Sequence, residues 1–356
     1  MKLIFDQAVL EKVLAVVSRG IATKPPMPIL NGILIDATDT AVYCSATDTE
    51  LAIRMKVPDV QIGASGKLLI SGKQFTDVVS SLSPGQIKLT ADTNKVIVQS
   101  KQAEFELPSL SAADFPEMQG PSGVTYIVDA DNLKTAIKQT IFATTSELLK
   151  PYLSSVLFEI KPGMLRLVAT DARRITVKEI PVQSKISRSI LVPVKSLKEI
   201  AEIIDGEVTF MIDDEQIFVM NQEITINSKL IIDQFPNYQQ LIPQKFMGEI
   251  ILERDAFIKS LERTSLVSES VKLEIRNDSI ILSSAATDSG QFREELPIAQ
   301  SGDLSTVGFK VKYLLDFLKA IDTEKIEFKY NGDNKPAVLK LKDQNDYQYI
   351  VMPSRL

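Results

Sequence analysis

Histidine is absent from the 356-residue sequence, and cysteine occurs only once. Without histidine the chain has no Ser-His-Asp or Cys-His nucleophile, no imidazole general base and no His-ligated metal site. The single Cys44 can form neither an internal disulfide nor a thiolate cage, and its surroundings, AVYCSAT, predict a strand with a buried thiol. We expect no metal and no cofactor, and only carboxylate, lysine or serine chemistry remains open.

Long hydrophobic runs are also missing. No apolar stretch approaches the roughly 20 residues that a helix needs to span a bilayer, and the opening MKLIFDQAVLEK meets acidic residues too early for a signal peptide. With 44% hydrophobic and 24% charged residues, the chain is expected to be globular, soluble and cytoplasmic.

Acidic residues slightly outnumber basic ones. The sequence has 40 lysines and arginines and 46 aspartates and glutamates, which gives a net charge of −6. This balance argues against a nucleic-acid-binding protein that works by bulk attraction. It leaves open a protein whose positive charge is confined to one surface.

A threefold repeat is the most informative property of the chain, whose length suits two or three domains. The tripeptide Ala-Thr-Asp ends at Asp48, Asp171 and Asp288, with spacings of 123 and 117 residues. Two sets of apolar stripes at helical spacing recur in the same register, and a lysine precedes the second set each time, at Lys73, Lys195 and Lys312. The first set is Leu10, Val13, Leu14 and Val17, then Leu133, Ala136, Ile137 and Thr140, then Phe257, Ser260, Leu261 and Thr264. The second set is Phe75, Val78, Val79 and Leu82, then Leu197, Ile200, Ala201 and Ile204, then Leu314, Phe317, Leu318 and Ile321.

These stripes predict helices over 8–19, 72–82, 131–144, 195–205, 255–266 and 310–322, separated by strands of period two that close into hairpins. Each third reads β-α-β-β-β twice, an α+β domain in which an antiparallel sheet carries two helices. The segments MQGPSG and PQKFMG predict linkers, so we expect domains at 1–122, 123–245 and 246–356. Units near 120 residues are too long for solenoid repeats or propeller blades, whereas domains joined in a row can close head to tail.

The segments LRLVATDARRITV, DQFPNYQQLIP, TKPPMPILNGILI and the C-terminal YIVMPSRL resemble the bacterial DNA sliding clamp family, the beta subunit of DNA polymerase III, and the resemblance covers all 356 residues. It implies a head-to-tail homodimeric ring of six domains, with helices around the hole and sheets at the rim. Duplex DNA passes through such a ring, and the DNA polymerase III alpha subunit, other polymerases and the clamp loader bind it. The resemblance also implies a processivity factor without catalytic activity.

The resemblance further implies a cleft between the second and third domains that binds short peptides of these partners. Its arginines are expected to offer donors to the peptide, with Arg174 as a partly solvated charge. The family usually has Gly-His where this chain has Ala172-Arg173, and a larger apolar residue in place of Ser354. For Ile175 and Val351, a role in the core agrees with the sequence as well as contact with the peptide does. For the tail 352–356 we expect a binding function. The matched positions are Leu153, Thr170, Ala172, Arg173, Arg174, Ile175, Pro236, Gln240, Leu241, Ile350, Val351, Met352, Pro353, Ser354, Arg355 and Leu356.

DNA contacts are implied at Lys24, Lys73, Lys150, Tyr152, Lys195 and Lys198. Tyr152 is equally compatible with a half-buried ring packed on Leu153, and helix lysines are commonly plain surface residues. The six predicted helices carry a net charge of +2 and the rest of the chain −8, so the sign fits DNA but the difference is small. At the dimer interface, Phe105 and Leu107 are expected to face Leu266 and Val267 of the other chain.

Two rival interpretations remain. An enzyme would need carboxylates such as Asp171 and Asp288 to converge, but the repeat places them one per domain, where a Thr-Asp turn satisfies local backbone amides. A monomeric repeat scaffold that binds other proteins without encircling DNA stays open. The native mass decides between this monomer and the homodimeric ring.

Overall fold

A computed structural model describes residues 1–22, 27–92, 94–145, 150–286, 288–298 and 304–354. The chain divides into two compact units. Unit 1 comprises Met1–Ala130 with Lys195–Leu230, and unit 2 comprises Asp131–Val194 with Ile231–Leu356. The second repeat therefore contributes to both units. Among the described residues, no helix is long and apolar enough to cross a membrane.

Unit 1 is built on a sheet with the strand order β10-β15-β16-β17-β4-β3-β2-β6-β9-β8-β7-β1-β5, all pairs antiparallel. Its helices are α1 (Gln7–Val17), α2 (Gly72–Ser81) and, from Lys195 on, α4 (Val194–Ile203). Its strands are β1 (Lys2–Asp6), β2 (Gly32–Ala37), β3 (Val42–Thr47), β4 (Leu51–Val57), β5 (Gln61–Ala64), β6 (Gly66–Ser71), β7 (Gln86–Ala91), β8 (Lys95–Gln99), β9 (Glu104–Leu110), β10 (Val124–Asp129), β15 (Glu207–Ile212), β16 (Gln216–Met220) and β17 (Ile224–Lys229).

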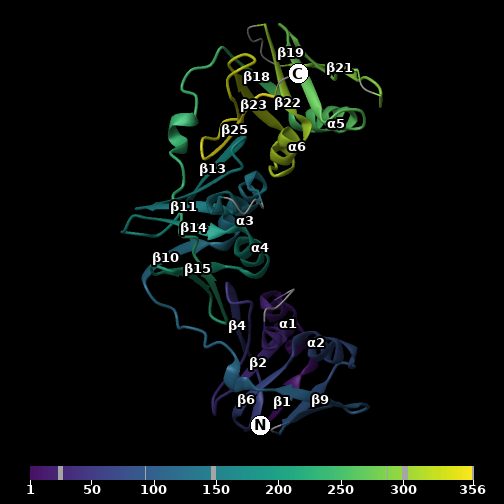
Figure 1. Ribbon diagram of the computed structural model, residues 1–356, viewed down its shortest axis with the longest axis vertical. Coiled ribbons are helices and arrows are strands. Elements are labelled where there is room, and N and C mark those ends of the chain that lie inside the picture. Colours follow the sequence, from purple (N-terminus) through teal and green to yellow (C-terminus); the bar gives the residue numbers. More distant parts are fainter. Residues whose placement is uncertain (23–26, 93, 146–149, 287, 299–303, 355–356) are drawn as a thin grey trace. The chain divides into compact units, whose positions relative to one another are not determined.

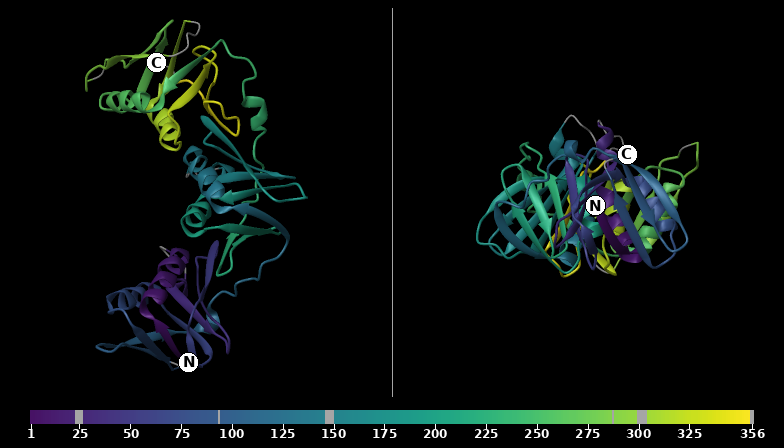
Figure 2. Two further views of the ribbon diagram at one scale, coloured as in Figure 1. Left: turned by 180° about the vertical axis from the view of Figure 1, so that it is seen from behind. Right: turned by 90° about the horizontal axis from the view of Figure 1, so that it is seen from below.

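Unit 2 contains two antiparallel sheets, with the orders β14-β11-β12-β13-β25-β24-β23-β18 and β21-β20-β19-β22. Its helices are α3 (Ala130–Lys138, from Asp131 on), α5 (Arg254–Ser265) and α6 (Val311–Lys319), of which α5 and α6 lie side by side (Figures 1 and 2). Its strands are β11 (Ser155–Lys161), β12 (Met164–Thr170), β13 (Arg174–Pro181), β14 (Arg188–Pro193), β18 (Gly248–Glu253), β19 (Ser270–Ile275), β20 (Ser279–Ser283), β21 (Arg293–Pro297), β22 (Ser305–Lys310), β23 (Lys325–Tyr330), β24 (Ala337–Leu341) and β25 (Tyr347–Val351).

The first helix illustrates why the predicted elements form. Asp6 caps it, because its side chain accepts hydrogen bonds from the backbone N–H groups of Ala8 and Val9. Its stripe of leucines and valines is fully buried against the sheet. Cys44 lies buried in β3, and burial raises the pKa of its thiol to about 12, which confirms an unreactive core cysteine.

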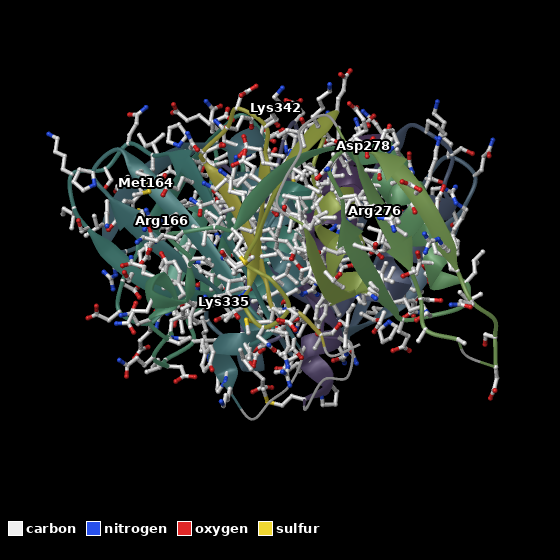
Figure 3. All side chains as sticks on the ribbon, turned by 90° about the horizontal axis from the view of Figure 1, so that it is seen from above. Met164, Arg166, Arg276, Asp278, Lys335 and Lys342 are labelled. Atoms are coloured by element: carbon white, nitrogen blue, oxygen red, sulfur yellow. The ribbon has the colours of Figure 1, made fainter. Side chains whose placement is uncertain are left out.

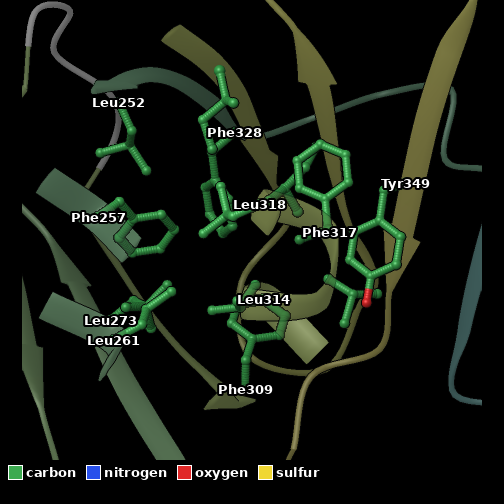
Figure 4. Packing of buried hydrophobic residues seen from close by; sticks show 14 of the residues in the cluster. Leu252, Phe257, Leu261, Leu273, Phe309, Leu314, Phe317, Leu318, Phe328 and Tyr349 are labelled. Atoms are coloured by element: carbon green, nitrogen blue, oxygen red, sulfur yellow. The ribbon is translucent and has the colours of Figure 1, made fainter. Parts of the chain in front are cut away.

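The core of the third repeat is packed in the same way (Figure 4). Phe257 and Leu261 of α5 and Leu314 and Phe317 of α6 are completely buried against the sheets. Phe317 also stacks on Tyr349 of β25, with ring centroids 5.0 Å apart. Strand β25 is therefore part of the core of the third repeat, and its pairing with β13 places it next to the second repeat.

The predicted order β-α-β-β-β twice per third is confirmed, with β5 as an additional short strand in the first repeat. All residues of the two stripe sets are buried except Val78 and Ala201, which are half-buried. The prediction of one helix over 131–144 is wrong, because α3 ends at Lys138. The hydroxyl of Thr140 donates to the carbonyl oxygen of Ala136 at 2.7 Å, and a short 3-10 turn follows at Ile141–Ala143.

Candidate functional site

Strand β13 of the second repeat pairs with β25 of the third, so that one sheet runs across both repeats (Figure 1). Arg174 lies opposite Val351 in this pairing. Unit 1 contains the corresponding junction, where β4 of the first repeat pairs with β17 of the second and Leu51 lies opposite Ser228. In both junctions the first strand begins three positions after the aspartate of an Ala-Thr-Asp tripeptide.

The Thr-Asp turns are structural. Asp171 Oδ1 accepts hydrogen bonds from the backbone N–H groups of Arg173 at 2.9 Å and Arg174 at 3.1 Å, while the Thr170 hydroxyl donates to the Arg174 carbonyl oxygen at 2.8 Å. Asp48 Oδ1 accepts the equivalent bonds from the backbone N–H groups of Glu50 and Leu51. The first two aspartates thus satisfy local amides as predicted, and Thr287 of the third turn lies outside the described residues.

Each of these two turns contains a residue in the left-handed region of the backbone. Ala172 has φ 68° and Thr49 has φ 80°. Glycine adopts this conformation without strain, whereas a residue with a Cβ pays roughly 1–2 kcal/mol. The Gly-His of the family would place its glycine where this chain has Ala172, so the departure has a defined conformational cost.

Arg174 is a buried structural residue, with 4% of its side chain exposed. It donates to Asp171 Oδ2 at 2.9 Å, to Asp316 Oδ2 of α6 at 2.7 Å and to the Phe142 carbonyl oxygen at 2.6 Å. Burial lowers the pKa of Arg174, but Tyr349, Asp316 and Asp171 outweigh this and raise it above its ordinary value. The expectation of a partly solvated Arg174 is wrong, because its side chain is 4% exposed and its three donor nitrogens bind groups of the chain itself. Contact between Arg174 and a peptide stays a prediction.

The C-terminal tail continues from β25 and is fixed at two points. The Met352 N–H donates to the Arg173 carbonyl oxygen, and the Ser354 N–H donates to the Gly308 carbonyl oxygen of β22, both at 2.9 Å. Met352 is 43% exposed, and Pro353 and Ser354 are half-buried. Arg355 and Leu356 lie outside the described residues. The tail thus bridges the turn of the second repeat and the third repeat.

A cleft of about 1000 Å³ opens beside this turn, between elements of the second and third repeats. The predicted site residues Leu153, Ala172, Arg173 and Arg174 line it, as does Lys150, which was expected to contact DNA. The remaining lining residues are Thr144, Thr145, Asp171, Ser265, Ser268, Glu269, Lys310, Val311, Lys312, Tyr313, Leu315, Asp316 and Lys319.

Four other predicted site residues are buried and support the cleft from within. Thr170, Ile175, Ile350 and Val351 are at most 6% exposed. Ile175 and Ile350 belong to one apolar cluster, and Val351 belongs to the core of the third repeat. For Ile175 and Val351, this burial favours the core interpretation that the sequence left open.

Pro236, Gln240 and Leu241 lie exposed on the segment that joins the second repeat to the third. Tyr238 anchors this segment, because its hydroxyl donates to Glu159 at 2.6 Å and accepts from Arg166 of β12. Burial raises the pKa of Tyr238, and the bond to Glu159 adds to this. The anchor leaves Leu241 56% exposed.

Sequence reasoning missed the wall of the cleft that α6 provides. Tyr313, Leu315 and Asp316 of this helix line the cleft together with Lys310, which directly precedes it. The repeated Lys312, which itself lines the cleft, marked the start of this helix in the sequence. Its counterpart in the second repeat, Lys195, forms an ion pair with Asp48 at the first junction.

The predicted DNA-contacting residues differ in their environments. Lys73 and Lys198 are exposed on α2 and α4. Lys195 is held by Asp48, and Tyr152 packs edge-on against Phe235 at 5.8 Å, which favours the packing interpretation of this ring. Lys24 lies outside the described residues.

The predicted dimer residues lie on two separate elements. Phe105 is half-buried and Leu107 buried on β9. Within the part of the chain that the structure describes, the 104–108 part of this strand pairs with β8 only. Leu266 follows the last residue of α5 and is 78% exposed, and Val267 beside it is half-buried.

Comparisons with known proteins agree with this architecture. Family descriptions of the DNA polymerase III beta subunit match the chain in three parts, the N-terminal domain at residues 1–119, the central domain at 127–237 and the C-terminal domain at 239–355. The beta sliding clamp of Pseudomonas aeruginosa is 27% identical over 97% of both chains. That of Staphylococcus epidermidis is 27% identical over 95% of this chain and 94% of its own.

Solved structures show the same fold. The DNA polymerase sliding clamp of Bacillus subtilis matches with a TM-score of 0.97 at 25% identity, covering 100% of this chain and 99% of its own. The beta subunit of Thermotoga maritima matches with a TM-score of 0.94 at 27% identity and the same coverage. A Pseudomonas aeruginosa sliding clamp bound to griselimycin also matches, with a TM-score of 0.94 at 26% identity over the whole of both chains. The chain, with its three repeats joined strand to strand, belongs to the bacterial DNA sliding clamp family, the beta subunit of DNA polymerase III.

Proposed function

We propose that this chain is a DNA polymerase processivity factor, a non-catalytic clamp that encircles duplex DNA and tethers polymerases and the clamp loader in the cytoplasm. The observation that carries the proposal is the strand-to-strand joining of three repeats, which leaves the strands equivalent to the joined ones without such a partner at the two ends of the series among the described residues. A chain of this construction is completed by a second copy. The domains at 1–122, 123–245 and 246–356 would then supply six domains per ring.

The two strand segments in question are β21 of the third repeat and the 104–108 part of β9 in the first repeat. At each internal junction the fourth strand of one repeat pairs with the last strand of the next, as β4 does with β17 and β13 with β25. In the described residues the fourth strand of the third repeat, β21, pairs with β20 only, and the 104–108 part of β9 pairs with β8 only. Pairing of β21 with β9 of a second copy would repeat the internal junctions and close a homodimer.

The repeat register also supports the proposed apolar contact across this interface. Phe142 follows α3 as Leu266 follows α5, and Phe142 packs against Tyr349 with ring centroids 5.7 Å apart. By the same register Phe105 in β9 corresponds to Tyr349 in β25. Leu266 and Val267 would therefore pack against Phe105 and Leu107 of the partner as Phe142 packs against Tyr349.

The cleft beside Arg173 is the proposed site for partner peptides. Exposed Leu241 and Met352 and the lining residue Leu153 offer apolar contacts to a peptide, and the tail 352–356 completes the site. The positions that correspond to Ile350 and Met352 at the first junction are Asn227 and Lys229, which line a pocket of about 200 Å³. Since this pocket is also lined by Gln119 and Gln216, we propose one apolar peptide site per chain.

DNA would be held by topology, with helix lysines such as Lys73 and Lys198 meeting phosphates through water. The net charge of −6 supports weak chemical attraction, because each neutralised phosphate adds only about 0.9 to the salt slope of the affinity. The test is to load the clamp on nicked circular DNA and wash with high salt. We expect retention on the circle and loss after linearisation, and equal loss from both forms would contradict encirclement.

A further inference from the structure

The cleft is basic, although the chain as a whole is acidic. Six lining residues are lysine or arginine and three are aspartate or glutamate, whereas the whole chain has 40 basic and 46 acidic residues. A cleft that served only apolar anchors would gain nothing from this excess of positive charge. The excess therefore needs its own explanation.

Three of the six cations are neutralised within unit 2. Arg174 pairs with Asp171 and Asp316, and Lys312 pairs with Asp316 at 2.7 Å. Lys319 pairs with Glu262 at 2.7 Å. These pairs engage two of the three acidic lining residues, Asp171 and Asp316. Glu269 is the third carboxylate of the cleft wall.

The other three cations, Lys150, Arg173 and Lys310, are exposed, and no carboxylate of the described residues forms an ion pair with them. Lys310 lies with its Nζ 5.7 Å from the centroid of the Tyr313 ring, another residue of the cleft wall. Arg173 is fixed at its backbone by the bond from its N–H to Asp171 and by the bond that its carbonyl accepts from Met352. Its guanidinium is therefore a charge on a rigid base at the mouth of the cleft.

We propose that this cleft selects peptides that carry a carboxylate next to their apolar anchors, with Arg173 as the main specificity-determining residue and Lys310 and Lys150 as its supports. This inference rests on the proposed peptide-binding function of the same site. Guanidinium binds carboxylate with two parallel hydrogen bonds, and the walls of a cleft reduce the screening of such a pair by solvent. A neutral peptide with the same anchors would bind without this contribution.

DNA is the competing ligand for these cations, because Lys150 was expected to contact it. The grouping favours the peptide, since Lys150 and Arg173 line the same cleft as the apolar Leu153 and Leu315. A phosphate backbone requires no apolar wall. DNA binding by these residues is accordingly an outcome that would overturn the proposal.

The test uses the full chain and two fluorescent peptides with the same two leucine anchors, one with Glu and the other with Gln beside the anchors. Anisotropy titrations compare the wild type with Arg173→Gln, Lys310→Gln and the double variant. Lys335→Gln serves as the control, because Lys335 is exposed in the turn before β24 and does not line the cleft (Figure 3). We expect the Glu peptide to lose about threefold in affinity with Arg173→Gln and about tenfold with the double variant. The Gln peptide and the control variant should change less than twofold, and high salt should remove the preference for Glu.

The outcomes separate this inference from the proposed function. Equal affinity of the Glu and Gln peptides for the wild type would overturn the charge selection while leaving the apolar peptide site in place. Binding of neither peptide would remove the peptide site and the charge selection together. If Arg173→Gln reduced retention on circular DNA and left both peptides unchanged, the cations would serve DNA and the inference would be wrong.

Discussion

Buried Arg174 and half-buried Asp316 form an ion pair, with Nη1 and Oδ2 2.7 Å apart, that joins the turn of the second repeat to α6 of the third. The two residues are separated by 142 positions in the chain. Asp171 shares the same guanidinium at 2.9 Å, so one arginine holds two carboxylates beside the cleft. This arrangement makes Arg174 a residue that shapes the cleft from beneath.

Replacing Arg174 by alanine should destabilise the second unit by about 3 kcal/mol, because two carboxylates lose their shared cation. A loss of this size lowers the corresponding melting temperature by about 6 °C or more. Differential scanning calorimetry measures it, with Arg173→Ala as the control, since Arg173 is exposed and should change stability by about 0.5 kcal/mol or less. Equal melting of both variants would show that the buried pair adds no stability.

The ion pair of Asp48 and Lys195 predicts an acid-sensitive first junction. Burial raises the pKa of Asp48, but the bond from Lys195 and two backbone amides outweigh this and lower it below its ordinary value. A carboxyl with a lowered folded-state pKa stabilises the protein above its unfolded-state pKa of about 4, and this stability is lost as pH falls through the folded-state value.

Asp48→Asn keeps an acceptor for the backbone amides and removes the charge. We expect this variant to be less stable than the wild type by about 1–2 kcal/mol at pH 7, and by a smaller amount at pH 3, because the stabilisation by the charge shrinks as pH falls below about 4. Urea unfolding of both proteins between these pH values measures the difference. A difference that stayed constant with pH would mean that the charge of Asp48 does not stabilise the junction.

Ala172→Gly should stabilise the chain slightly. The left-handed φ of 68° costs alanine roughly 1–2 kcal/mol of strain, which glycine does not have. Glycine in turn loses about 0.5–1 kcal/mol more backbone conformational entropy on folding than alanine does. The expected net gain is therefore about 0.5 kcal/mol. Ala113→Gly is a suitable control, because this exposed alanine has no positive φ and should only lose stability. Denaturant midpoints that fall for both variants would contradict the strain.

Much of the architecture could be predicted because it repeats. Three helical stripes in one register fix elements that a single stripe would leave ambiguous, and the Thr-Asp turns follow from local hydrogen bonding alone. The burial of Arg174 could not be predicted, because its partner Asp316 is distant in sequence and its neighbour Arg173 has the same chemistry but is exposed. The meeting of Lys150 and Lys310 in one cleft likewise depends on which elements pack together.

The proposed dimer interface is tested by Leu266→Ala combined with Val267→Ala. Leu266 is 78% exposed in the single chain, so its removal should leave the fold intact while removing apolar contacts to β9 of the partner. Analytical ultracentrifugation at low micromolar concentration should find folded monomers. Ile232→Ala is the control, because Ile232 is 89% exposed but lies outside the proposed interface. A double variant that sediments as the wild type would place the interface elsewhere.

Deleting residues 352–356 should abolish peptide binding and leave dimerisation nearly unchanged. Strand β25 ends at Val351 and keeps its pairing with β13, so the truncation removes the tail without opening the core. The loss should be about 3 kcal/mol or more, since the Met352 side chain and the anchoring bonds of the tail to Arg173 and Gly308 disappear together. Met352→Ala isolates the side chain and should cost about 1–2 kcal/mol, because Met352 is already 43% exposed and the backbone bond remains. Fluorescence anisotropy with a labelled peptide, run beside sedimentation of the same samples, measures binding and assembly together. An unchanged dissociation constant for the truncated dimer would move the peptide site away from the β13–β25 junction.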